Sequence, residues 1–209
     1  MGVMKMVMQK QIHHLHHHQH LRLRKHLNRR IRQRLRLPLR RVTNVALNAA
    51  FEVSSHTGET HTVWGWHASF INDGNTEFLP YENVGWTTQV GIIMTEEDWW
   101  DQWVLFDIGG ELLIDKVVLY PIEGLAPFFP IDYHVEVSTD NSNYTTVISV
   151  VDDFSTANED DSPKELKFDP VVARYVRVVF TKPYNVPNAD GYLVQLAEIE
   201  IYTAEENQD

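Results

Sequence analysis

Two stretches of sequence decide how this chain folds: Ala173-Arg174-Tyr175-Val176-Arg177-Val178 and, later in the chain, Leu196-Ala197-Glu198-Ile199-Glu200-Ile201-Tyr202. In each, apolar and polar residues alternate, which places one set of side chains on a buried face and the other on an exposed face. A third run, 133–138, repeats the pattern, with Val135 and Val137 on one face and His134 and Glu136 on the other. Such alternation predicts half-buried β-strands.

Turn-forming residues separate these runs. Gly, Pro, Asn and Asp gather at 122–127 and 138–143, where their side chains suit turns rather than strand ladders. No segment of 42–209 keeps a helical period for more than three turns. Many short antiparallel strands joined by turns predict an all-β sandwich or barrel.

Read with 103–109, 114–120 and 135–140, the two opening segments resemble the discoidin, or coagulation factor five/eight type C, family. The similarity is greater to its bacterial branch, which includes carbohydrate-binding modules of family thirty-two. This resemblance implies an eight-stranded antiparallel jelly-roll β-sandwich of galactose-binding-domain-like type. Animal members usually close their ends with a disulfide, and the chain has no cysteine, which again favours the bacterial branch.

Charge divides the chain near residue 41. Residues 1–41 hold twelve of the eighteen lysines and arginines, seven of the eleven histidines and no acid. In 42–209, six basic residues set against twenty-nine acids give a formal charge of −23. We therefore predict a basic extension, 1–41, followed by one domain, 42–209. Nucleic acid is not an expected partner of 42–209, because affinity for phosphate backbones depends on Lys and Arg.

The basic extension is of low complexity, with histidines clustered at 13–20 and Arg-Leu repeats at 21–24 and 34–37. We expect it to be disordered, or to be translated upstream sequence, because biased tracts rarely pack. The alternatives are an arm for nucleic acid or anionic membrane and a His-rich metal-binding tract. The sequence shows no signal peptide and no apolar run long enough for a membrane span.

A loop rich in oxygen donors, 68–76, contains the turn Asp73-Gly74. Calcium takes six to eight oxygens from carboxylates, amides and backbone carbonyls. In the family that the chain resembles, a loop of this type and the Glu of the last strand hold a structural Ca²⁺ ion. Carried over, the resemblance implies side-chain ligands from Asp73 and Glu198, backbone carbonyls from Phe70, Asn75 and Ala197, and a further ligand from Thr76 or Thr87. The alternative is that Asp73-Gly74 forms an ordinary surface turn and binds no cation.

Six tryptophans fall within 64–103, and Trp99-Trp100 follow the polar run 95–98 in a connection that should be exposed. Exposed aromatic residues on loops are unusual unless they contact something. We read Trp103, by contrast, as strand packing. In the family, loops at one end of the fold bind sugar, and they correspond here to 54–63, 87–102, 121–131 and 183–191. The candidate sugar-binding residues are His56, Glu59, His61, Trp64, Trp99, Trp100, Tyr184, Asn185 and Asn188, with Asp190, Phe128 and Phe129 as further candidates.

The resemblance implies a non-catalytic carbohydrate-binding module, extracellular or at a cell surface, appended to or acting with a glycoside hydrolase. Galactose-type members often use an Arg that has no counterpart here, since Arg174 and Arg177 both lie on a predicted strand. The alternatives are a protein- or cell-surface adhesion module and a small glycoside hydrolase. No motif for a catalytic nucleophile, a zinc protease or a phosphate loop is present, so we do not expect an enzyme.

Overall fold

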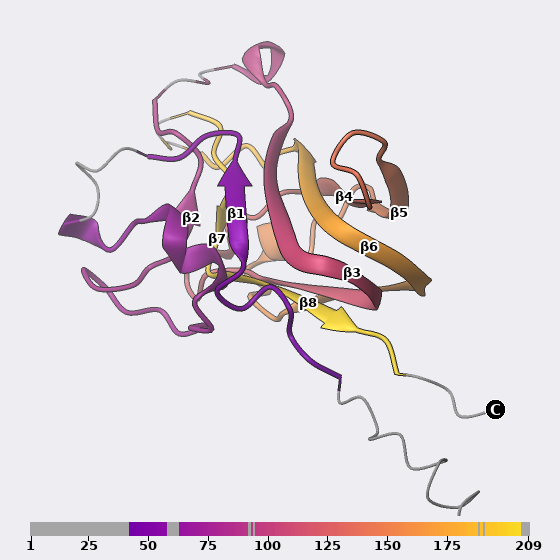
Figure 1. Ribbon diagram of the computed structural model, residues 1–209. Helices are drawn as coiled ribbons and strands as arrows, with labels where there is room; N and C mark the ends of the chain where they lie inside the picture. Colours follow the sequence, from indigo (N-terminus) through magenta and orange to yellow (C-terminus); the bar gives the residue numbers. More distant parts are fainter. Residues whose placement is uncertain are drawn as a thin grey trace, which may run out of the picture. The chain divides into compact units, whose positions relative to one another are not determined.

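The computed structural model describes residues 42–57, 63–91, 93, 95–187, 189 and 191–205. The basic extension lies outside these residues, so its predicted disorder stays a prediction. Within them, antiparallel strands are joined by loops and single turns of 3₁₀ helix, which confirms the all-β prediction (Figure 1). The elements in chain order are β1 (Ala50–Val53), η2 (Ala68–Asn72), β2 (Trp86–Thr87), η3 (Glu96–Asp98), β3 (Gln102–Tyr120), η4 (Ala126–Phe128), β4 (Asp132–Ser138), β5 (Thr145–Val150), η5 (Thr156–Asn158), β6 (Lys164–Lys182), β7 (Gln195–Leu196) and β8 (Glu198–Thr203).

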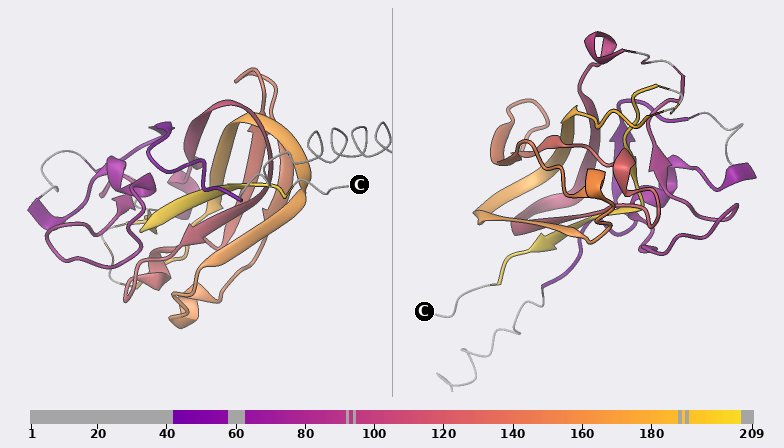
Figure 2. Two further views of the ribbon diagram at one scale, coloured as in Figure 1. Left: turned by 60° about the horizontal axis from the view of Figure 1, so that its bottom comes forward. Right: turned by 180° about the vertical axis from the view of Figure 1, so that it is seen from behind.

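Two long, bent strands build the domain. β3 and β6 pair along their whole length, from Gln102 opposite Phe180 to Leu119 opposite Lys164. The pairing register shifts between Asp107 and Leu112, where Gly109 adopts a φ of 84° that other residues rarely tolerate. The left view in Figure 2 shows the two long strands curving strongly along their length.

The bend lets β3 and β6 serve two layers. The first half of β3 pairs with β1, and its second half pairs with β8. The second half of β6 pairs with β4, which in turn pairs with β5. β2 and β7 form a separate two-stranded sheet. The jelly-roll winding implied by the family resemblance stays a prediction.

The core lies between the layers. Alternate residues of β3, Val104 and Phe106, face inward and are fully buried, as are Ile199 and Ile201 of β8. Trp86 of β2 is also fully buried within this cluster. These inward side chains come from each layer and pack against one another, so the alternation of apolar and polar residues in the sequence produces the core of the sandwich.

Hydrogen bonds close the two ends of the domain on each other. The Val45 N–H donates to the Ile201 carbonyl at 2.7 Å, and the Thr203 N–H donates to the Thr43 carbonyl at 3.1 Å. Residues 43–45 therefore lie antiparallel to β8 and tie the first described segment to the last strand. No helix among the described residues is both long and apolar enough to cross a membrane.

Candidate functional site

Two of the segments predicted to bind sugar meet at the end of the sheet where β1 ends and β3 begins. Ser54 Oγ donates to Gln102 Oε1 at 3.0 Å, and Ser55 Oγ donates to the same oxygen. Gln102 Nε2 in turn donates to the Trp100 carbonyl at 3.1 Å. Ser55 also accepts from the Gln89 N–H at 3.4 Å. Fully buried Gln102 thus links two of the segments predicted to bind sugar, 54–63 and 87–102, a role that no sequence pattern revealed.

Several predicted sugar-binding residues lie at this same end. His56 is exposed and its Nδ1 lies 2.8 Å from the Thr57 carbonyl, while Trp100 is 48% exposed. Half-buried Tyr184 and exposed Asn185 follow the end of β6, whose Phe180 stands opposite Gln102. Glu59, His61, Asn188 and Asp190 lie outside the described residues, so their positions stay predictions.

Trp99 differs from its expected place. It is only partly exposed and packs against the main core, and its buried Nε1 has no hydrogen-bond partner among the described residues. The expectation that Trp99 is exposed is therefore wrong. The Trp99 N–H donates to the Glu96 carbonyl at 3.1 Å and ends the turn Glu96–Asp98, and the next residue, Trp100, is exposed. Half-buried Trp103 lies on β3 as expected, on its outer face.

Trp64 forms a pair with Tyr81, which the sequence did not single out. The ring centroids are 5.7 Å apart, and the two side chains are 55% and 67% exposed. Tyr81 has a left-handed φ of 66° in the turn that the bridge between Leu79 and Asn83 closes. Trp64 and Tyr81 therefore form an exposed aromatic pair.

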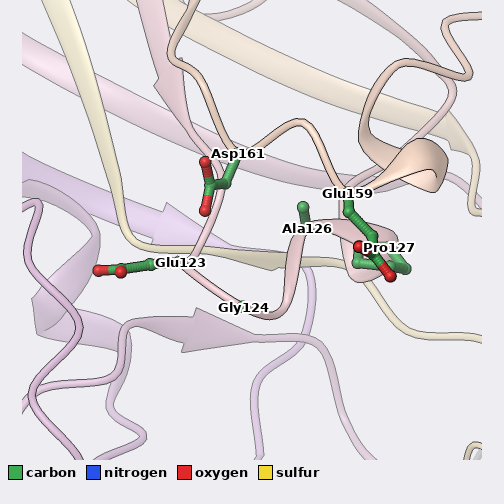
Figure 3. Close-up of a pocket in the computed structure, with 6 residues that line it drawn as sticks. All are labelled: Glu123, Gly124, Ala126, Pro127, Glu159 and Asp161. Carbon is green, nitrogen blue, oxygen red and sulfur yellow. The ribbon is translucent and has the colours of Figure 1, made fainter.

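The 121–131 turn borders a different kind of surface. A hollow of about 490 Å³ lies between this turn and the end of η5, lined by Glu123, Gly124, Ala126, Pro127, Glu159 and Asp161 (Figure 3). None of the predicted sugar-binding residues is among those six. Phe129 is 1% exposed and packs edge-on against Tyr133 at 5.4 Å, so it is a core residue and not the stacking surface we considered. Phe128 is half-buried.

The predicted cation ligands Asp73 and Glu198 are brought together across the fold. Glu198, at the start of β8, is fully buried, and its Oε1 accepts from the Gly74 N–H at 3.2 Å. Its Oε2 is buried without a partner among the described residues. Burial raises the pKa of Glu198 to about 8, and the nearby charges of Asp73 and Glu200 add to the rise.

The rest of the loop surrounds this carboxylate. Asp73 Oδ1 accepts from the Asn75 N–H at 2.8 Å, and Oδ2 accepts from Asn83 Nδ2 at 2.6 Å. Phe70 and Asn75 are half-buried, Thr76 is exposed and Ala197 is buried beside Glu198. The other candidate, Thr87, is buried and donates to the Thr88 carbonyl at 3.1 Å. Within the described residues, no three His, Cys, Asp or Glu side chains are grouped as a metal site, so any cation here needs backbone oxygens as well.

The antiparallel strands and the core between them define the domain as an all-β sandwich. The model of the F5/8 type C domain family matches residues 51–198, and the chain belongs to this family. No curated protein matches the chain.

Three solved structures that are similar to this chain bear names that mention a carbohydrate or a carbohydrate-binding module. A CBM32 module from Clostridium perfringens, solved with GalNAc-β-1,3-galactose, is 21% identical, covers 77% of this chain and 99% of its own, and has a TM-score of 0.57. Chitosan-binding module 1 of a chitosanase/glucanase from Paenibacillus sp. IK-5 is 25% identical, with coverages of 77% and 98% and a TM-score of 0.54. The lectin domain of lectinolysin, solved with Lewis B antigen, is 18% identical, with coverages of 78% and 97% and a TM-score of 0.56.

Proposed function

We propose that this domain is a non-catalytic carbohydrate-binding module that recognises a terminal or short glycan. The observation that carries the proposal is the exposed Trp64–Tyr81 pair, in a family whose similar structures include sugar-binding modules. A pyranose ring offers C–H groups on one face and hydroxyls around its edge, so a flat aromatic surface fits it. Rigid aromatic side chains also supply contact area at low entropic cost.

The backbone supports this assignment of the pair. A left-handed conformation at a residue other than glycine costs on the order of 1 kcal/mol, and it persists only where surrounding structure holds it. Tyr81 is held in this conformation yet leaves its ring exposed, with Trp64 as its neighbour. Strained, exposed aromatic residues that contribute little to the core are typical of binding surfaces.

A second group of candidate residues extends the proposed surface to the end of the sheet where β3 begins. His56, Trp100, Tyr184 and Asn185 lie where the strands β1 and β6 end and β3 begins. Glu59, His61 and Asn188 belong to the same proposal through their places in the sequence. Amide, imidazole and carboxylate groups can each bind sugar hydroxyls, and a few such groups beside an aromatic ring are sufficient for a weak, selective site.

We also propose a structural Ca²⁺ ion at the 68–76 loop. The buried, unpartnered Glu198 Oε2 supports it, because a buried polar atom without a partner is a rare and costly feature that a bound cation would remove. The side chains of Asp73 and Glu198, the carbonyls of Phe70, Asn75 and Ala197, and Thr76 would hold the ion. When bound, it would neutralise the carboxylates and fasten the loop to β8.

The cellular setting follows from the family. We propose that the domain acts outside the cell or at its surface, next to a glycoside hydrolase. One of the similar modules derives from such an enzyme, the chitosanase/glucanase of Paenibacillus. The acidic domain would not add affinity for anionic lipid, which favours basic residues.

The test is a glycan-array screen of the full chain with calcium present, followed by titration calorimetry on the best ligand. The double variant Trp64→Ala/Tyr81→Ala should weaken binding at least about tenfold, or about 1.4 kcal/mol, with an unchanged Tm. Phe154→Ala is the matched control, since it removes an exposed aromatic ring far along the chain beside η5, and it should bind normally. Full binding by the double variant would exclude the pair as the platform, and glycan hydrolysis by the purified chain would overturn the non-catalytic assignment.

A further inference from the structure

A second hollow lies on the outer face of the sheet. It has a volume of about 250 Å³ and is lined by residues of β1, β3 and β6 and of the β4–β5 turn, among them Ala50, Glu52, Leu105, Asp107, Asn141 and Tyr175. Drug-sized ligands occupy pockets of about 300 Å³ and more, so this one suits a single small ring. None of its residues belongs to the candidate sites described above.

Strand register explains why these side chains converge. Ala50 stands opposite Asp107, which stands opposite Tyr175, so three adjacent strands contribute one row. Glu52 stands opposite Leu105, two residues along, and therefore faces the same side of the sheet. Both Leu105 and Tyr175 are half-buried and form the apolar part of the lining, and the small side chain of Ala50 leaves space between the others.

The β4–β5 turn places an amide at the edge of this hollow. Asp140 accepts hydrogen bonds from the N–H groups of Ser142 and Asn143 at 2.9 and 2.8 Å, which holds its pKa well below the usual range and fixes the turn. Asn141 adopts a left-handed φ of 59° at the tip, and its Oδ1 accepts from the Tyr144 hydroxyl. No described residue accepts from its Nδ2, which leaves that group to donate to a ligand.

Charge selects among the possible ligands. The Asp107 carboxylate is already neutralised, because Arg174 donates to both of its oxygens at 3.0 and 2.9 Å. Arg177, the next cation on this face, is bound to Glu136 and lies over the Tyr144 ring at 4.1 Å. The Arg174 guanidinium also lies over the Tyr175 ring, 5.1 Å from its centroid, so this ring already has a cation beside it. Exposed Glu52 has no ion-pair partner among the described residues, and it gives the hollow one uncompensated negative charge. That charge favours a ligand with a cationic group.

We infer that this hollow binds one pyranose residue that carries a protonated amine. Glu52 pairs with the ammonium group, the Asn141 amide donates to a ring hydroxyl, and the apolar lining contacts the ring carbons. The site is a second carbohydrate contact on the sheet, separate from the loops, and it does not depend on the Trp64–Tyr81 pair.

The experiment uses the full chain with Trp64→Ala/Tyr81→Ala, so that the loop surface is removed. A β-1,4-linked glucosamine trimer is the probe, and the N-acetylglucosamine trimer, which lacks the charge, is the matched control ligand. Backbone amide shifts followed by NMR should move at residues 50, 52, 141 and 175, with a Kd on the order of a millimolar at low salt. The N-acetylated trimer should bind at least about fivefold more weakly.

Two substitutions decide the outcome. Glu52→Gln should abolish the preference for the free amine, and Ala50→Leu, which fills the hollow with a neutral side chain, should abolish the shifts altogether. Glu111→Gln, which removes an exposed carboxylate of β3 outside the hollow, should change neither. Shifts at residues other than those of the hollow, or an amine preference that survives Glu52→Gln, would overturn the inference.

Discussion

Replacing Glu198 with glutamine should remove most of the pH dependence of this domain's stability between about pH 5 and pH 8. Burial raises the pKa of Glu198 in the folded, calcium-free protein to about 8, whereas the pKa of this side chain in the unfolded chain would be near its ordinary value of 4.5. Between these values the folded state holds a proton that the unfolded state has lost. The free energy of unfolding therefore falls as the pH rises through this window, and it levels off above about pH 8.

The size of the effect follows from the same pair of values. Each pH unit between the two pKa values lowers the free energy of unfolding by about 1.4 kcal/mol, so the total loss is at most about 5 kcal/mol. Relaxation and water penetration reduce such penalties, so on the order of 3 kcal/mol is the expected loss. For a domain of this length that corresponds to a fall in Tm of about 6 to 12 °C between pH 5 and pH 8.

The assay is thermal unfolding across this pH range, with chelator and then with excess calcium. Glu198→Gln keeps the size of the side chain and an oxygen to accept from Gly74, but it cannot ionise, so its Tm should change little with pH. Calcium requires the ionised carboxylate and should therefore raise the Tm of the wild type most at high pH, and that of the variant hardly at all. Glu165→Gln, an exposed carboxylate on β6, is the control and should behave like the wild type. Equal pH profiles for the wild type and Glu198→Gln in chelator would refute the reasoning.

Three further predictions concern the fold. Gly85→Ala should destabilise the domain by more than about 3 kcal/mol in urea unfolding, because the added Cβ would lie 2.3 Å from the Leu196 carbonyl oxygen at a φ of 131°; a loss below 1 kcal/mol would contradict this. Phe129→Ala should lower the free energy of unfolding by about 3 to 5 kcal/mol in the same measurement, because its ring is buried, and should leave glycan affinity unchanged at temperatures well below the Tm. The fragment 42–209 should unfold at the same temperature as the full chain by calorimetry, and failure of the fragment to fold would show that 1–41 supports the core.

The strands could be predicted from the sequence because each depends on a local period. Val176 and Val178 are buried and Arg177 is not, as the alternation required. The segments 103–109 and 114–120 were expected as separate runs and are the two halves of one bent strand, β3. The bend depends on a register shift between paired strands, and no single segment encodes it.

The site was predicted less completely, for physical reasons. The pairing of the 68–76 loop with Glu198 was expected because a family resemblance carried that long-range contact, which local sequence does not specify. The contact between Trp64 and Tyr81 depends on the backbone conformations of two loops. Trp99 and Trp100 are the same residue type at adjacent positions, yet the first side chain is half-buried and the second is exposed. Loop geometry, unlike strand period, leaves little trace in composition.

The antiparallel contact between residues 43–45 and β8 has a mechanical consequence. Tension applied through the two ends of the domain would pull on this contact at its outer end, where the Thr203 N–H meets the Thr43 carbonyl. In that direction the hydrogen bonds break one after another instead of resisting together. A domain held under tension between these ends would begin to unfold at the contact between residues 43–45 and β8, before force reached the bent strands β3 and β6.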